Sequence, residues 1–220
     1  MEEQSSFLNY RCLGVNQKNT MIFIIDDDAS MRDALSYLLL AAGYEFEAFA
    51  SAEAFLERPR FEGVGCIILD VRMSGMSGLD LQRELANVHC PMPIIFITAH
   101  GDIPMSVEAM KRGAIDFLPK PFDDEQLLGA MEAAIARHGQ ARTVCNETQA
   151  IQERIKKLTP REYEVFRYVI TGLLNKQIAA ELNIAERTVK IHRGRVMEKL
   201  AAQSVADLVR LAQKVGISAV

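Results

Sequence analysis

Acidic residues follow two of the most apolar stretches of this 220-residue sequence. The run 66–69 (Cys-Ile-Ile-Leu) ends at Asp70, and the run 21–25 ends at Asp26 and Asp27. Short unbroken apolar runs are typical of buried parallel strands, whose carboxyl ends meet at the edge where open α/β sheets bind ligands. Carboxylates gathered at such an edge repel one another, so we expect a hard divalent cation among them.

Two further polar residues occupy equivalent positions. Thr98 ends the apolar run 94–98, and Lys120 follows the run 115–118. Taken singly, each residue has an ordinary explanation, such as a strand-end hydroxyl, a surface charge or, for Asp28, a helix cap. Because each of these residues ends or follows an apolar run, together they favour one functional pocket at one end of a sheet.

The spacing of apolar residues predicts which elements position these side chains. From residue 21 onward, period-2 or continuous apolar runs alternate with stretches of helical periodicity. We expect strands at 21–26, 45–49, 66–70, 94–98 and 115–118, and helices near 29–42, 51–57, 77–87, 103–112 and 123–137. This alternation indicates an α/β domain with a five-stranded parallel, doubly wound sheet.

The remainder of the chain predicts a second, all-α domain. Residues 1–20 show no clear period and are expected to form a flexible leader, and 138–157 are polar enough for a linker with partial helical structure. Thr159, Pro160 and Glu162 then have the order of a capping box. We expect helices at 160–171, 175–182, 186–200 and 204–215, the second and third joined as a helix-turn-helix over 158–220.

Charge separates the two halves. Residues 151–220 hold 13 Lys and Arg against 7 Asp and Glu, a balance of +6, which leaves −10 for residues 1–150. The acidic half suits a task with a metal ion or phosphate, and the basic half suits an anionic polymer. The four cysteines have no metal-ligand spacing, and we find neither a secretory signal nor a membrane span, so we expect reduced thiols in a cytoplasmic protein.

The segment 21–137 resembles the receiver domain of two-component response regulators, on the strength of Asp26-Asp27, Asp70, Thr98-Ala99 and Lys120-Pro121-Phe122. The resemblance implies that Asp70 accepts a phosphoryl group from a sensor histidine kinase. It further implies that Mg2+ is held by Asp26, Asp27, Asp70 and the main-chain carbonyl of Arg72. Lys120 and Thr98 would contact the phosphoryl oxygens, and Phe117 would act with Thr98 as the switch that promotes a homodimer.

One residue departs from the receiver pattern. The position four residues after the phosphoacceptor is usually proline in the family, whereas this chain has Ser74. Proline would fix φ and stiffen the loop, so serine is expected to loosen it by about 0.4–1 kcal/mol. We expect this change to affect the rigidity of the loop rather than the chemistry.

The segment 158–216 resembles a LuxR-type helix-turn-helix, through 158–162, 175–179 and 187–192. With the receiver, this pattern resembles the NarL/FixJ family of transcription factors and implies promoter DNA and RNA polymerase as partners. On the helix from 186, Lys190 and Ile191 are expected nearest base edges, and nearby basic residues are expected to hold phosphates. The full predicted contact set is Lys176, Arg187, Thr188, Lys190, Ile191, Arg193 and Arg195.

Two alternatives remain open at this point. A phosphatase of the haloacid-dehalogenase type also places Asp after a strand, but it needs a second Asp two positions later, where this chain has Arg72. A constitutive DNA-binding protein with a vestigial receiver would not need Asp26, Asp27, Asp70, Thr98 and Lys120 together. We therefore expect a phosphorylation-controlled regulator and not an enzyme.

Overall fold

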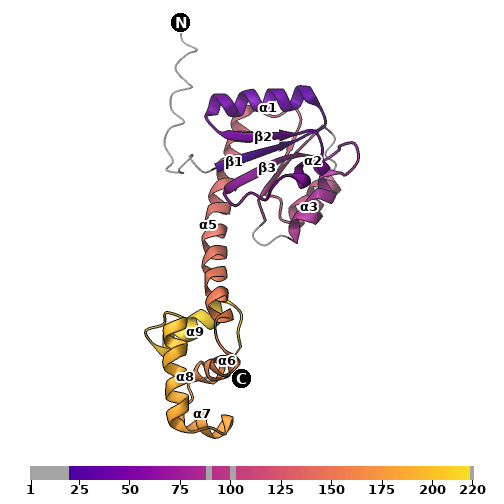
Figure 1. Cartoon of the computed structure of the whole chain (residues 1–220). Coiled ribbons are helices and arrows are strands. Elements are labelled where there is room, and N and C mark those ends of the chain that lie inside the picture. Colours follow the sequence, from indigo (N-terminus) through magenta and orange to yellow (C-terminus); the bar gives the residue numbers. More distant parts are fainter. Residues whose placement is uncertain (1–19, 88–90, 100–102, 219–220) are drawn as a thin grey trace. The chain divides into compact units, whose positions relative to one another are not determined.

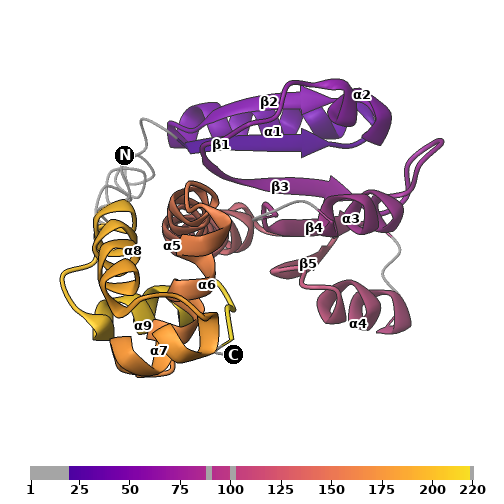
Figure 2. The ribbon, with the colours of Figure 1, turned by 60° about the horizontal axis from the view of Figure 1, so that its bottom comes forward.

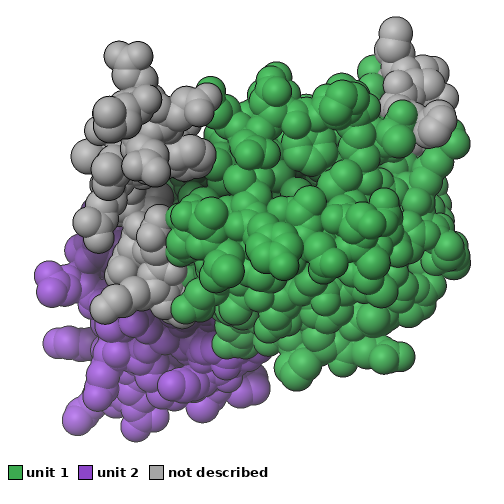
Figure 3. All heavy atoms as spheres, turned by 90° about the horizontal axis from the view of Figure 1, so that it is seen from above, with its two compact units in different colours: residues 1–142 green, residues 143–220 purple. Residues whose placement is uncertain are grey.

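The computed structural model describes residues 20–87, 91–99 and 103–218, so nearly all of the predicted leader lies outside the described residues. The chain divides into two compact units, Met1–Arg142 and Thr143–Val220, which Figure 3 shows in different colours. Each unit has its own hydrophobic core and is described by itself. No helix within the described ranges is both long and apolar enough to cross a bilayer.

The first unit is built on a parallel sheet of five strands in the order β2-β1-β3-β4-β5 (Figure 2). The strands are β1 (Thr20–Ile25), β2 (Glu45–Phe49), β3 (Val64–Asp70), β4 (Ile94–Thr98) and β5 (Asp116–Pro119). Ile25 pairs with Leu69, Asp70 with Ile97, and Thr98 with Pro119. This register places the carboxyl ends of four strands at one edge, as the sequence predicts.

Helices cover both faces of this sheet (Figure 1). Because side chains alternate along a strand, Ile22 and Ile24 of β1 pack in one core while Phe23 and Ile25 pack in the other. The first core includes α1 and α5, and the second includes α2, α3 and α4. These helices are α1 (Ala29–Ala42), α2 (Ala52–Glu57), α3 (Gly78–Ala86), α4 (Ile103–Lys111) and α5 (Asp124–Lys156).

The last of these helices extends beyond the end expected for it. A helix end was expected at 137, but α5 continues as one helix through 138–156. His138, expected as the first linker residue, is buried at 3% exposure, and its Nδ1 lies 3.0 Å from the main-chain nitrogen and 2.9 Å from the main-chain oxygen of Gly65. The side chain that opens the predicted linker thus packs against β3 and belongs to the first unit.

The second unit is all-α, as predicted. Its helices are α6 (Pro160–Val169), α7 (Asn175–Leu182), α8 (Glu186–Lys199) and α9 (Val205–Lys214). The predicted capping box is present, because the Thr159 side chain accepts from the Glu162 amide while Glu162 accepts from the Thr159 amide. Asn183 ends α7 with a φ of 50°, which provides the tight turn into α8.

Candidate functional site

Three of the predicted pocket residues form one buried cluster at the carboxyl edge of the sheet. Lys120 Nζ lies 2.9 Å from Asp26 Oδ2 and 2.9 Å from Asp70 Oδ1. Asp26 and Asp70 are 1% and 6% exposed. One ammonium therefore bridges two carboxylates that come from the ends of β1 and β3, and without it they would repel each other.

Main-chain amides donate to the other oxygens of the two carboxylates. The Arg72 amide donates to Asp70 Oδ2 at 2.7 Å, and the Asp28 amide donates to Asp26 Oδ1 at 2.8 Å. Arg32, in the first turns of α1, donates to the main-chain carbonyl of Asp26 at 2.7 Å. The sequence reasoning did not single out Arg32, and its only signal was a basic residue in the helix that follows the acidic loop. Asp28 caps α1 as predicted.

Burial and pairing shift the pKa values of this cluster. Burial raises the pKa of Asp70 above its ordinary value, an effect that the hydrogen bond and charge of Lys120 oppose and that the charge of Asp26 increases. Burial alone would lower the pKa of Lys120, but its hydrogen bonds to Asp26 and Asp70 outweigh this effect and raise it. Lys120 is therefore cationic when its two partners are ionised, which is the state that a phosphoryl group would meet.

Asp27 differs from its two acidic neighbours because it is exposed and bound to a different partner. Asp27 Oδ2 accepts from the Ser74 amide at 2.8 Å and from Ser74 Oγ at 2.9 Å. These hydrogen bonds, led by the amide, lower the pKa of Asp27. The departure from the family pattern at Ser74 therefore reaches a predicted cation ligand, whereas the sequence reasoning expected an effect on loop rigidity alone.

Thr98 and Phe117 lie on adjacent strands beside this cluster. Thr98 is 1% exposed, and its carbonyl accepts from the Lys120 amide at 2.8 Å, which ties the ends of β4 and β5 together. Phe117 is half-buried, and its ring centroid lies 6.2 Å from that of Phe96. The Phe117 side chain is thus partly exposed to solvent, and its role as a switch stays a prediction.

The chemistry of the donors fits a hard divalent cation. Asp26, Asp27, Asp70 and the carbonyl of Arg72 offer only oxygen atoms, which are the ligands that Mg2+ prefers. Within the described ranges, however, no three acidic, histidine or cysteine side chains are arranged as a metal site. In this structure Lys120 pairs with Asp26 and Asp70, and Ser74 donates to Asp27.

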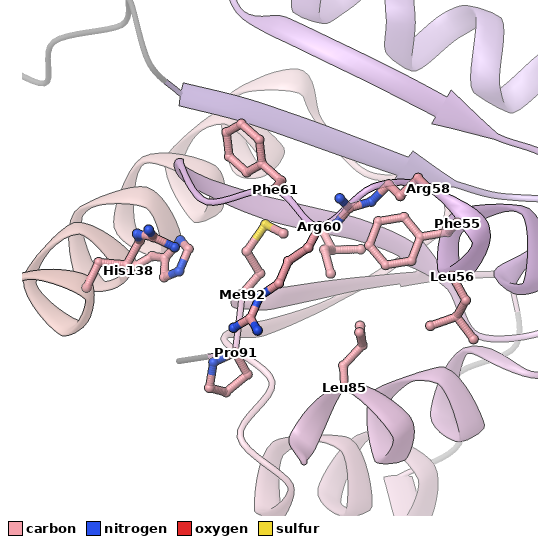
Figure 4. Close-up of a pocket in the computed structure, with 11 residues that line it drawn as sticks. Phe55, Leu56, Arg58, Arg60, Phe61, Leu85, Pro91, Met92 and His138 are labelled. Atoms are coloured by element: carbon pink, nitrogen blue, oxygen red, sulfur yellow. The ribbon is translucent and has the colours of Figure 1, made fainter. Parts of the chain in front are cut away.

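A separate cavity of about 260 Å3 in the first unit contains none of the predicted site residues (Figure 4). Phe55 and Met92 are among its apolar lining residues, and Arg58 stacks over the Phe55 ring at 4.2 Å. His138 lines it from α5 and contacts the amino end of β3 through Gly65. This cavity therefore belongs to the opposite end of β3 from Asp70.

The second unit presents a basic surface on α8. Val189, Val196 and Leu200 are fully buried in the core, as predicted from the helical wheel. Side chains on the other face are exposed, and Ile191 retains 48% of its accessible surface. Within the part of the chain that the structure describes, four basic side chains of α8 and the start of α7 form no hydrogen bond or ion pair: Lys176, Arg187, Lys190 and Arg195.

Two details of α8 refine the predicted DNA contacts. Arg193 Nη1 donates to Asn175 Oδ1 at 2.9 Å, so this half-buried arginine joins α8 to the start of α7, a role that the sequence reasoning missed. A Cβ added at Gly194 would meet no heavy atom within 4 Å, so packing inside the chain does not require glycine there. The space beside Gly194 is therefore open to the approach of a partner.

Comparison with known proteins places both units in recognised families. The family described as response regulator receiver domain matches residues 22–132, and the bacterial regulatory proteins of the luxR family match residues 156–212. Nodulation protein W of Bradyrhizobium diazoefficiens is 49% identical over 90% of this chain and 88% of its own length. FixJ of the same organism is 44% identical over 89% of this chain and 96% of its own length.

Solved structures agree with these matches. The response regulator StyR is 48% identical and superposes with a TM-score of 0.77. The match covers 89% of this chain and 99% of the StyR chain. Full-length FixJ from B. japonicum is 44% identical with a TM-score of 0.53, over 91% of this chain and 98% of that one. The chain therefore belongs to the NarL/FixJ family of response regulators, transcription factors in which a receiver domain is followed by a LuxR-type DNA-binding domain.

Proposed function

We propose that Asp70 is the phosphoacceptor of this regulator and that its phosphorylation by a sensor histidine kinase controls binding of promoter DNA by α8. The observation that supports this most directly is the buried Asp70 carboxylate with Lys120 Nζ 2.9 Å from it. A carboxylate at this position can attack phosphorus, and a fixed cation beside it can neutralise the charge that accumulates on the phosphoryl oxygens.

The proposed transfer assigns one task to each residue. An oxygen of Asp70 forms a bond to phosphorus as the bond between phosphorus and the donor imidazole breaks, which leaves an acyl phosphate on Asp70 and the electron pair on the imidazole. Lys120 keeps its ammonium close to Asp70 and pairs with a phosphoryl oxygen. The buried Thr98 hydroxyl then donates to another phosphoryl oxygen, and Phe117 responds on the adjacent strand.

We further propose that Mg2+ is bound by Asp26, Asp27, Asp70 and the carbonyl of Arg72. When bound, the ion would neutralise the negative charge that accumulates on the phosphoryl oxygens during transfer. The donor set supports this proposal because it contains only oxygen. The exposed side chain of Arg72, which stands where a phosphatase of the haloacid-dehalogenase type needs an acid, supports a regulator that is phosphorylated once over an enzyme that turns over phosphoesters.

In the DNA-binding unit, we assign Lys190 and Ile191 to base edges, since both are exposed on α8. Lys176, Arg187 and Arg195 are exposed basic groups suited to phosphates, and Thr188 and Arg193 lie next to them. Gly194 supports close approach of DNA to the helix, because no side chain of the protein occupies the space beside it.

We propose that the boundary between the receiver and DNA-binding domains lies near Arg142 and that the protein acts in the cytoplasm, where DNA and RNA polymerase are its partners.

Sedimentation velocity with and without acetyl phosphate tests the proposed control. We expect the phosphodonor and Mg2+ to shift the full-length protein from monomer to dimer and to raise its affinity for the promoter fragment. The variant Asp70→Asn keeps the shape of the side chain but should show neither change. An identical sedimentation profile for the wild-type protein under both conditions would contradict phosphorylation-driven dimerisation.

A further inference from the structure

The loop after β3 is attached to the acidic residues after β1 through Ser74. Both donors of this serine, the amide and the hydroxyl, reach the same oxygen of Asp27, at 2.8 and 2.9 Å. Proline, the usual residue of the family at this position, has neither donor. This pair of hydrogen bonds is therefore a property of this chain and not a general feature of the receiver fold.

A second carboxylate holds the same loop from the other side. Glu53, in the first turn of α2, accepts from the Met76 amide at 2.9 Å. Gly75, between the two attachment points, has a φ of +84°, and a Cβ there would lie 2.9 Å from Glu53 Oε1. The loop is thus fixed at Ser74 and at Met76, but only the first attachment uses a residue of the proposed cation site.

The attachment at Ser74 engages an oxygen that a cation would use. Both donors of Ser74 reach Asp27 Oδ2, and a divalent ion between β1 and β3 would compete with them for that oxygen. Asp26 and Asp70 are already directed at Lys120. For Asp27 Oδ2 to join them on a cation, its hydrogen bonds with Ser74 must weaken, or the loop must move with it.

We propose that Ser74 is an internal competitor of Mg2+: its amide and hydroxyl hold Asp27 in the unloaded state and raise the Mg2+ concentration that the receiver needs. This inference rests on the proposed cation site. The same loop contains the carbonyl of Arg72, another proposed ligand, so binding of the ion and release of the loop are one coupled change. The receiver is thereby made sensitive to free Mg2+, since only the loaded pocket is competent for phosphoryl transfer.

Isothermal titration calorimetry of Mg2+ into the full-length protein tests this proposal without any measurement of activity. Ser74→Pro removes both hydrogen bonds to Asp27, and we expect it to bind Mg2+ about 5- to 10-fold more tightly than the wild-type protein. Ser74→Ala removes only the hydroxyl and should bind about 2- to 3-fold more tightly. The alanine variant also provides the test if the proline variant does not fold, which thermal unfolding without Mg2+ would reveal.

Glu53→Ala is the matched control. It frees the same loop at Met76 but leaves the contact between Ser74 and Asp27 in place, so its Mg2+ affinity should stay within about 2-fold of the wild-type value. Equal tightening in all three variants would show that general loosening of the loop is responsible and would overturn the proposal. Weaker binding in Ser74→Ala and Ser74→Pro would also overturn it, because Ser74 would then orient Asp27 for the ion.

The failure of this inference can be told apart from the failure of the proposed function. If wild-type protein and both Ser74 variants bind Mg2+ with the same affinity, the cation site stands and the competition by Ser74 is refuted. If none of the proteins binds Mg2+, the proposed cation site itself is refuted, and the inference is refuted with it.

Discussion

Asp26 and Asp70 in the receiver unit are buried and pair with the half-buried Lys120, whereas Arg187, Lys190 and Arg195 on α8 are exposed and unpaired within the described residues. The first set must be complete to be stable, because removal of one charge leaves another buried without a partner. The second set consists of separate charges in water, and we propose that each contacts DNA almost independently of the others. The receiver pocket should therefore respond to single substitutions as a unit, and the DNA surface should respond in small, separable steps.

Among the substitutions that test this comparison, Lys120→Met should have the largest effect, which is on the rate of phosphorylation. It removes the cation that bridges Asp26 and Asp70, so we expect phosphorylation by acetyl phosphate to slow by about 100-fold. The rate can be followed by intact-protein mass spectrometry at fixed Mg2+. Lys111→Met, at the exposed end of α4, is the matched control and should leave the rate unchanged. A rate near that of the wild-type protein in Lys120→Met would show that the buried cluster does not act as a unit.

Substitutions on the DNA surface should be weaker and should differ in kind. Lys190→Ala is expected to lose about 1–3 kcal/mol on the promoter fragment and little on random DNA, because a base contact distinguishes sequences. Lys176→Ala should weaken binding to both DNAs alike and reduce the salt slope by about 1, because a phosphate contact does not read sequence. Fluorescence anisotropy at several salt concentrations measures both quantities. Equal losses on both DNAs for both variants would refute this assignment.

The smallest effect concerns a buried acid that is not part of either functional surface. Glu162 is 1% exposed, caps α6, and has a carboxylate oxygen 2.6 Å from Lys199 Nζ. The hydrogen bond from Lys199 and, to a smaller extent, the hydrogen bond from the Thr159 amide lower the pKa of Glu162 from its ordinary value. Because its pKa is depressed in the folded state, its contribution to stability is present above the unfolded value and is lost as pH falls through the folded value. Glu162→Gln should destabilise the second unit by about 1–2 kcal/mol at neutral pH.

Hydrogen exchange of the α6 and α8 amides in the full-length protein reports this change locally. The matched control is Glu164→Gln, because Glu164 lies in the same helix but forms an exposed pair with Arg161, which should contribute less than about 0.5 kcal/mol. Equal protection in Glu162→Gln and wild-type protein at neutral pH would contradict the stabilising role of Glu162. The difference between them should be lost as the pH falls through the lowered folded-state pKa of Glu162, which is the expected sign of the pH dependence.

The parts of the fold that the sequence could predict are those set by local pattern. Apolar runs locate β1, β3 and β4, and the polar residues that follow them, Asp70 and Thr98 among them, are brought to one edge by the parallel order alone. The capping box of Thr159 and Glu162 is equally local and is present as predicted. These features depend on residues close in sequence or on a rule of topology, and both can be read without coordinates.

The features that the sequence did not predict depend on contacts between distant residues. Ser74 and Asp27 are 47 positions apart, and nothing near either residue indicates that they share two hydrogen bonds. The sequence predicts His138 in a linker, because the polar residues after it obscure the helical spacing of apolar residues. In the structure His138 contacts Gly65, 73 positions earlier, and is buried. Arg193 shows the same limit, since its exposed neighbours suggested a phosphate contact and its hydrogen bond to Asn175 was not foreseen.

The central claim is that a single acyl phosphate at residue 70 controls the protein. Intact-mass spectrometry and peptide mapping of full-length protein, incubated with Mg2+ and a phosphodonor, test this claim most directly. We predict one added phosphoryl group on the peptide that contains Asp70, removable by hydroxylamine and absent from Asp70→Asn. A phosphoryl group that persists in Asp70→Asn, or none in the wild-type protein with its own sensor kinase, would contradict the account.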